Sequence, residues 1–189
     1  LKEVYRKIAY RSHNDFDHVE KSSILYNMRG FGSLPSYSYQ KLIDKNIYRP
    51  TVKKVPFSYY PIEFVIKDPT LMSKGNDILL GNSASATNNH LEALDLLKEL
   101  DLNGRTIYTP LSYGNPRYCK AIVAYGSKLF LDSFEPLTTF LPLKEYNKVI
   151  SQCGIVIMNH YRPQAMGNII ASLYMGCKVF LNNTDAYQY

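Results

Sequence analysis

The sequence lacks several features that would define its class at once. No run of 18 apolar residues occurs in its 189 residues, which excludes a membrane-spanning helix of ordinary length. It opens with neither an initiator Met nor a signal peptide and stops just after an apparent strand, so we expect an excised, soluble piece of a longer protein. Three cysteines, Cys119, Cys153 and Cys177, are an odd number without metal-ligand spacing. Because they lie in or beside apolar stretches, we expect structural thiols in a reducing compartment.

The chain also lacks the GxGxxG fingerprint of dinucleotide-binding proteins and any cluster of carboxylates that resembles a metal site. What it has is a globular composition, with 46% apolar and 20% charged residues. A chain of this length buries about 70% of its unfolded surface. The formal charge of +6 is compatible with nucleic acid, anionic lipid or an anionic small ligand. Since the basic residues are not gathered in one stripe, net charge does not choose among them.

Two regions differ in composition, and we place the boundary after Pro69. Region 1–69 is rich in Tyr, Lys, Arg and Pro, with helices predicted at 1–11 and 36–45. In the first of these, Val4, Tyr5 and Ile8 recur at helical spacing opposite a basic face. Such a helix either packs on its own protein or lies on an anionic membrane surface.

Region 70–189 alternates apolar strand-like runs with amphipathic helices. Five strands are predicted at 77–82, 105–111, 128–132, 155–159 and 178–182, and four helices at 90–100, 116–126, 143–153 and 167–176. Strands that are apolar on both faces and joined by helices predict a parallel sheet covered on both sides. The expected fold class is therefore α/β, a doubly wound parallel sheet.

Ligands bind such sheets beyond the carboxyl ends of the strands, so the loops that follow the strands are the candidate site. The first loop, 81–90, consists of small polar residues and ends at a helix. Small side chains let the backbone approach an anion, and the free amides of a helix N-terminus favour a phosphate. The alternative is an ordinary loop in which Asn88 or Asn89 is the helix N-cap.

The second loop contains Tyr113 and Gly114 and is either a turn or part of the cleft. The third loop, 159–168, places His160, Arg162 and Gln164 before an apolar helix. Arg offers a planar fork for two phosphate oxygens, and the helix dipole adds to it. The alternatives are a solvated Arg and a hydrogen-bonded structural His.

Three segments together carry a family resemblance: ILLGNSASATNNHLEAL, PLSYGNPRY and RPQAMGNIIASLYMGCKVFLN. They resemble glycosyltransferase family 56, the bacterial 4-alpha-L-fucosyltransferase-like family that transfers N-acetylfucosamine from TDP-N-acetylfucosamine to lipid II, an undecaprenyl-linked acceptor. The likeness runs from Asp77 onward and, more loosely, over 1–64. It implies a GT-B architecture of two facing Rossmann-like domains, with 1–69 the tail of the acceptor-side domain and linker and 70–189 the donor-binding domain, truncated at its C-terminus.

The resemblance also implies partners and a place of action. The donor is a TDP-sugar or UDP-sugar, the acceptor is lipid-linked, and the protein lies in the cytoplasm, peripherally associated with the inner membrane through its missing N-terminal domain. We expect no nucleic acid partner, no cofactor and no metal, so that positive charge and helix amides stabilise the leaving diphosphate.

The residues expected at the donor site form two groups. Expected at the diphosphate are Arg162, Gln164, Gly167, Asn168, Gly81, Asn82 and Ser83. Expected at the sugar or nucleoside are Asn88, Asn89, His90, Tyr113, Gly114, Glu135 and His160, with the segment 140–143 bordering the base pocket. No catalytic residue is predicted. The rival functions are a nucleotide-sugar epimerase of the same fold and a non-enzymatic domain that binds nucleotides or nucleic acid.

Overall fold

The computed structural model describes residues 18–32, 36–56 and 58–183, which belong to two compact units. One unit comprises the residues up to Tyr59 together with those from Asn183, and the other is Tyr60–Asn182. The division falls ten residues before the boundary expected from composition. The predicted helix 1–11 lies outside the described residues.

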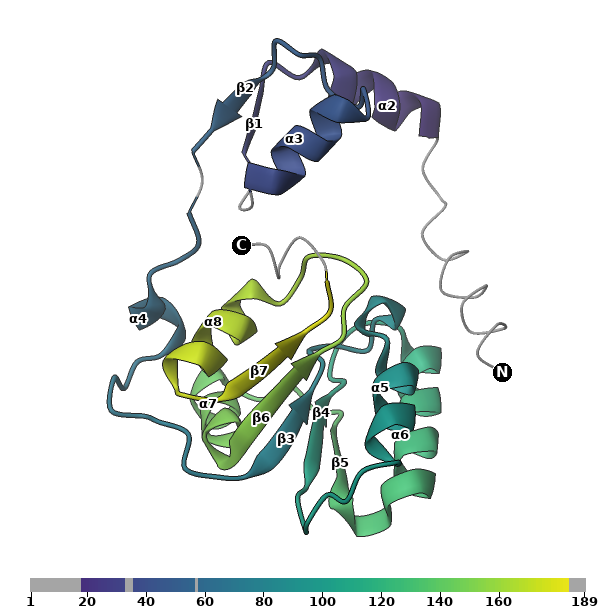
Figure 1. Ribbon diagram of the computed structural model, residues 1–189, viewed down its shortest axis with the longest axis vertical. Helices are drawn as coiled ribbons and strands as arrows, with labels where there is room; N and C mark the ends of the chain where they lie inside the picture. Colours follow the sequence, from purple (N-terminus) through teal and green to yellow (C-terminus); the bar gives the residue numbers. More distant parts are fainter. Residues whose placement is uncertain (1–17, 33–35, 57, 184–189) are drawn as a thin grey trace. The chain divides into compact units, whose positions relative to one another are not determined.

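The first unit contains a small βαβ arrangement. Its elements are α2 (His18–Asn27), β1 (Gly30–Gly32), α3 (Ser36–Asp44) and β2 (Lys53–Val55), and the two strands pair in parallel (Figure 1). The predicted helix at 36–45 is confirmed as α3. The Tyr39 hydroxyl donates to the Val52 carbonyl at 2.6 Å, and the rings of Phe31 and Tyr48 lie 4.7 Å apart.

The second unit is built on a five-stranded parallel sheet. The strands are β3 (Asp77–Leu80), β4 (Ile107–Pro110), β5 (Phe134–Leu137), β6 (Cys153–Met158) and β7 (Lys178–Leu181), in the order β5-β4-β3-β6-β7. From β3 the chain winds outward to β5, then returns to the other side of β3 for β6 and β7. This is the Rossmann-like order, and the predicted doubly wound sheet is confirmed.

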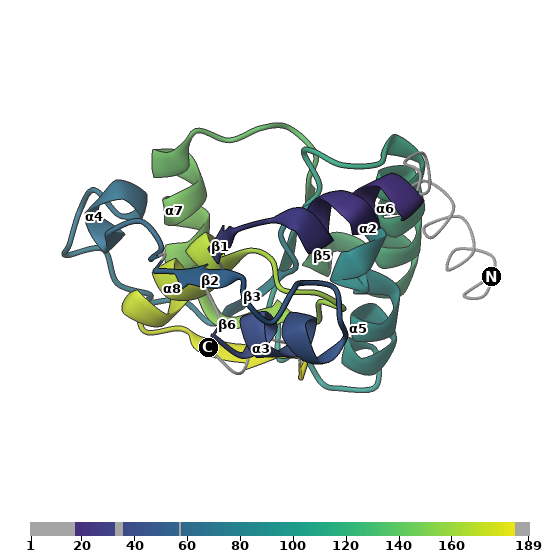
Figure 2. The same cartoon turned by 90° about the horizontal axis from the view of Figure 1, so that it is seen from above.

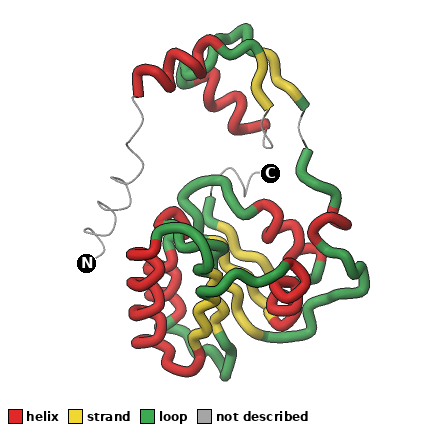
Figure 3. The backbone as a smooth tube through the Cα atoms, turned by 180° about the vertical axis from the view of Figure 1, so that it is seen from behind, coloured by secondary structure: helices red, strands yellow, loops and turns green. Residues whose placement is uncertain are grey.

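Helices cover both faces of this sheet. Figures 1 and 2 show α5 (His90–Leu97) and α6 (Pro116–Phe130) on one face, and α7 (Leu143–Gln152) and α8 (Met166–Tyr174) on the other. The tube in Figure 3 shows the strands between these two groups of helices. A further short helix, α4 (Ile62–Val65), precedes β3. None of the helices within the described residues is long and apolar enough to cross a membrane.

Apolar side chains from both layers and the sheet fill the core. The fully buried members include Leu79, Leu80, Leu94, Ile107, Ile122, Ile150 and Val156. Cys153 and Cys177 are buried free thiols, while Cys119 is half-buried. Burial raises the pKa of the Cys153 thiol to about 12, so this thiol is unreactive, as expected of a structural cysteine.

One predicted strand is wrong. Segment 128–132 is not a strand, because α6 continues to Phe130 and a 3-10 turn, Leu131–Ser133, follows it. The buried residues Tyr118, Ile122 and Gly126 repeat every four positions, and the next position at this spacing, Phe130, is the last residue of the helix. The actual strand begins at Phe134, whose ring packs so closely on Gly126 that a Cβ there would lie 2.3 Å from it.

Candidate functional site

The loop after β3 begins with a backbone turn that requires glycine. Gly81 has φ +69°, and a Cβ at this position would lie 2.4 Å from Nε2 of His90. A side chain here would therefore meet both backbone strain and a clash with the ring. The turn sends the chain out of the sheet at Asn82, directly above the edge where the parallel strands end.

The buried side chain of Asn88 fixes the conformation of this loop. Its side chain is fully buried, and its Oδ1 accepts from the backbone N–H of Asn82 at 2.9 Å and from Nε2 of His160 at 3.0 Å. Its Nδ2 donates to the carbonyl and the hydroxyl of Ser83, both at 3.0 Å, and to the Ser85 carbonyl at 3.3 Å. The amide thus fixes the backbone of the loop and links it to the segment after β6.

Two buried histidines flank Asn88. The Nδ1 of His90 lies 3.1 Å from the Tyr118 hydroxyl, whereas its Nε2 has no hydrogen-bond partner among the described residues. Burial, and secondarily His160, lowers the pKa of His90 to about 3. Burial and the Arg162 charge lower the pKa of His160 to about 4, against the opposing effect of a backbone hydrogen bond with Gln164. Both rings are neutral near pH 7, so His160 Nε2 carries the proton that it donates to Asn88.

Backbone hydrogen bonds join the three loops that follow β3, β4 and β6. The Ala84 N–H donates to the Tyr113 carbonyl at 2.7 Å, and the Asn115 N–H donates to the Ala84 carbonyl at 2.9 Å. On the other side, the Tyr161 N–H donates to the Thr87 carbonyl at 2.9 Å. The β3 loop therefore lies between its two neighbours and is bonded to each.

Side chains on these loops form a second, more exposed connection. The Nδ2 of Asn82 donates to the Tyr113 hydroxyl at 2.9 Å, and Nε2 of Gln164 donates to Oδ1 of Asn82 at 3.1 Å. Oε1 of Gln164 accepts from the Thr87 hydroxyl at 2.8 Å and from Nε of Arg162 at 2.9 Å. The only other hydrogen bond of Arg162 within the described residues runs from the same Nε to the Thr87 hydroxyl at 3.3 Å, so its two terminal nitrogens have no hydrogen-bond partner there.

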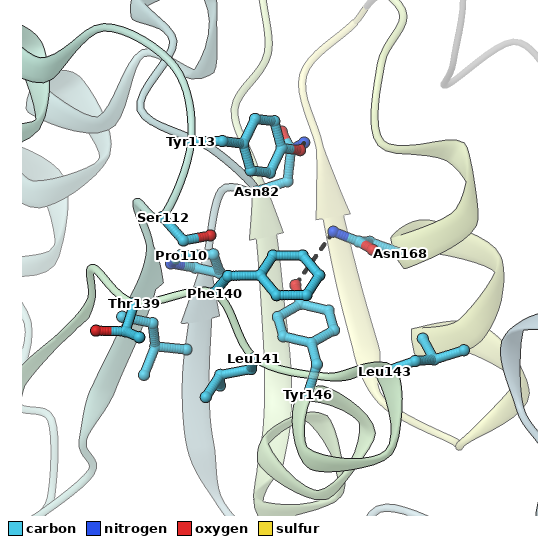
Figure 4. A pocket seen from close by; sticks show the side chains of 11 residues that line it. Asn82, Pro110, Ser112, Tyr113, Thr139, Phe140, Leu141, Leu143, Tyr146 and Asn168 are labelled. Carbon is cyan, nitrogen blue, oxygen red and sulfur yellow. Dashed lines mark hydrogen bonds between the residues drawn. The ribbon is translucent and has the colours of Figure 1, made fainter.

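A cavity of about 210 Å³ opens at the carboxyl ends of β3, β4 and β5. Figure 4 shows its lining, which comes from Asn82, Pro110, Ser112, Tyr113, Leu137, Thr139, Phe140, Leu141, Leu143, Tyr146 and Asn168. Inside it, Nδ2 of Asn168 donates to the Tyr146 hydroxyl at 3.1 Å. Among the described residues no charged side chain lines the cavity, so it suits an uncharged, partly apolar ligand group.

The N-terminus of α8 adjoins this cavity through Asn168. Ala165, which precedes the helix, has a left-handed backbone, and no side chain of the described residues caps the helix. The N–H groups of the first turn have no partner within the helix. Free amides at a helix N-terminus attract anions, and Arg162 lies four residues upstream in the same loop.

All of the predicted site residues except Glu135 fall into three groups. Asn82, Tyr113 and Asn168 line the cavity, as does most of the segment 140–143 predicted at the base pocket. The loops and the helix end beside the cavity contain Arg162, Gln164, Gly167, Gly81, Asn89 and Gly114. Ser83, Asn88, His90 and His160 are buried beneath the loops, where they hold the backbone. Glu135 is exposed on β5 and does not line the cavity. The ligand contacts of all these residues stay predictions.

The sequence reasoning missed Tyr146, Ser112 and Thr139. Tyr146 lies in the first turn of α7, half-buried in an ordinary amphipathic pattern, and nothing in that pattern distinguishes it from a core residue. Burial raises the pKa of its hydroxyl, which stays protonated at neutral pH. The rule that ligands bind beyond strand ends would have pointed to Ser112 and Thr139, which follow β4 and β5.

The fold is similar to that of a solved glycosyltransferase. A crystal structure of a glycosyltransferase from Rickettsia africae ESF-5 superposes with a TM-score of 0.66 at 16% identity, covering 90% of this chain and 48% of that one. This chain thus spans about half the length of that structure, and the likeness shows the fold.

The particular family follows from the sequence match. The chain belongs to the family described as 4-alpha-L-fucosyltransferase glycosyl transferase group 56, which matches residues 20–189. The resemblance found in the three loop segments is confirmed at the level of the family. The donor, the acceptor and the pathway stay predictions.

Proposed function

We propose that this chain is the donor-binding half of a GT-B glycosyltransferase. The whole enzyme transfers a deoxyamino sugar, such as N-acetylfucosamine, from a TDP-sugar to a polyprenyl-diphosphate-linked acceptor. The family supports a transferase that uses a nucleotide sugar. The proposed position of the donor site rests on one observation. Asn168, in the first turn of α8, lines the same cavity as Asn82, which follows β3. A nucleotide that occupies the cavity would extend its phosphates toward the free amides of α8.

In this proposal the two chemical parts of the donor bind to different surfaces. The uncharged cavity, with Phe140 and Tyr146 among its walls, takes the nucleoside. The diphosphate lies at the α8 N-terminus beside Arg162, whose terminal nitrogens form no ion pair within the described residues. A bidentate Arg contact and helix amides are well suited to the two phosphates.

The same groups assist the chemistry. When the glycosidic bond to the diphosphate breaks, negative charge grows on the leaving phosphate oxygen. Preorganised positive charge and N–H donors stabilise that charge without a bound metal. The acceptor site and its general base belong to the acceptor-side domain, which also carries the contact with the cytoplasmic face of the inner membrane.

The family membership favours this function over both rivals. An epimerase of the same fold and a nucleic-acid-binding domain share the Rossmann-like sheet, but the family matched over 20–189 is one of glycosyl transferases. Calorimetric titration with TDP, UDP, thymidine and a short single-stranded DNA separates a nucleoside-diphosphate site from a nucleic-acid site, whereas the epimerase is disfavoured by the family match alone. We expect TDP or UDP to bind and thymidine to bind far more weakly. Equal affinities for thymidine and TDP would count against the diphosphate site, and tight DNA binding would favour the nucleic-acid-binding domain.

A further inference from the structure

The carboxamide of Asn82 is held from both sides at the edge of the cavity. Figure 4 shows Asn82 and Tyr113 together at this edge. The Asn82 Nδ2 donates to the Tyr113 hydroxyl at 2.9 Å, and its Oδ1 accepts from Nε2 of Gln164 at 3.1 Å. Each amide atom has one further hydrogen-bonding position, a second hydrogen on nitrogen and a second lone pair on oxygen. Asn82 therefore has a fixed donor and a fixed acceptor left for a ligand.

The direction of these hydrogen bonds is set by Arg162. A guanidinium nitrogen only donates, so the Gln164 atom that faces Nε of Arg162 must be the oxygen. The other end of the Gln164 amide is then the NH₂ group, and it requires an acceptor from Asn82. Oδ1 of Asn82 meets this requirement, which turns Nδ2 toward Tyr113, whose hydroxyl can either donate or accept. The permanent charge of Arg162 thus fixes the orientation of the Gln164 amide and, through it, that of the Asn82 amide.

We propose that Gln164 is a positioning residue for the donor site, which acts by orienting Asn82 rather than by touching the phosphates. Resting on the proposed function, this inference makes the orientation of the Asn82 amide a determinant of how tightly the nucleotide binds. Gln164 is absent from the lining of the cavity, and the structure gives hydrogen-bond partners to both ends of its amide. Both acceptor positions of its oxygen and one of its two N–H groups bond to residues of the loops, as expected of a residue that positions them.

Two substitutions of Gln164 test whether it sets the orientation of the Asn82 amide. Gln164→Met keeps the length of the side chain but removes both polar ends, so Asn82 loses the donor that fixes it. Gln164→Glu keeps an oxygen for Arg162 and presents a second oxygen to Asn82. The Asn82 amide must then turn its NH₂ toward Glu and its oxygen toward Tyr113, which can donate to it. Glu therefore reverses the Asn82 amide, whereas Met releases it.

The test combines NMR of the Asn82 side-chain amide with calorimetric titration of TDP, on the 189-residue chain and its variants. In Gln164→Met we expect the Asn82 NH₂ resonances to move toward those of a solvated amide and the Kd for TDP to rise about five- to tenfold. In Gln164→Glu we expect a different, still ordered pair of resonances and at least as large a loss of affinity. The matched control is Gln152→Met, an exposed position at the end of α7, which changes neither measurement.

The outcomes distinguish this inference from the proposed function. Unchanged Asn82 resonances in a folded Gln164→Met variant overturn the inference, and so does an unchanged Kd alongside shifted resonances. If the wild-type chain fails to bind TDP, the proposed function fails, and the orienting role of Gln164 is then decided by the resonances alone. A backbone amide spectrum that matches the wild type outside the three loops shows that each variant is folded.

Discussion

Asn88→Ala is the substitution that most directly tests how the loop after β3 is supported. Removing this fully buried amide leaves two buried or half-buried donors, the Asn82 N–H and His160 Nε2, without their acceptor. An orphaned buried polar group costs about 1–3 kcal/mol. Because the Asn82 N–H lies close enough to the surface to recover part of this from water, we expect the free energy of unfolding to fall by about 3 kcal/mol. In a chain of this size that lowers Tm by about 6–12 °C.

The assay is thermal and urea unfolding followed by circular dichroism, with Asn89→Gly as the matched control. Asn89 is the neighbouring amide, and its backbone is left-handed (φ 54°), so glycine fits there without strain. Replacing an N-cap Asn by Gly costs only a few tenths of a kcal/mol, or about 1 °C. If Asn88→Ala unfolds at the same temperature as Asn89→Gly, the buried amide does not hold the loop and the reasoning fails.

Three further predictions concern charge, pH and activity. Arg162→Ala should weaken TDP binding by about 1.5–3 kcal/mol while the fold stays intact, as calorimetry and circular dichroism will show; an unchanged affinity removes Arg162 from the diphosphate site. The pKa of His160 is lowered from 6.5 to about 4 in the folded state, so the unfolded chain takes up the proton first as the pH falls. The stability that the neutral His160 contributes is therefore complete above pH 6.5 and is lost as the pH falls from 6.5 to about 4. This amounts to about 3 kcal/mol. The lowered pKa of His90, about 3, adds a further loss over the same fall in pH that continues to about pH 3, and equal urea midpoints at pH 7 and pH 4 would contradict both burial effects. Finally, the 189-residue chain should not transfer sugar to a polyprenyl-linked acceptor, because positioning by the acceptor-side domain supplies about 7–11 kcal/mol of the barrier; turnover in a radiolabel assay would refute the idea that it is half of an enzyme.

The predicted strand at 128–132 shows where local pattern is insufficient. A short apolar run fits either a strand or the last turn of an amphipathic helix, and periodicity alone does not separate them. The helix continued because Tyr118, Ile122 and Gly126 face the sheet at one spacing. Packing of the Phe134 ring against Gly126, a contact between an element and its successor, then fixed where the next strand begins.

In the site, too, local sequence patterns predicted some features and tertiary contacts decided the others. By itself the sequence determined the doubly wound sheet, the three loops that carry polar residues and the family, since all of these depend on periodicity and local motifs. Only the tertiary structure decided which polar residues face the cavity. Asn82 and Asn88 stand six residues apart in one loop, yet one lines the cavity and the other is fully buried. Their difference depends on partners that lie far along the chain, Gln164 for Asn82 and His160 for Asn88, and no local pattern reports such contacts.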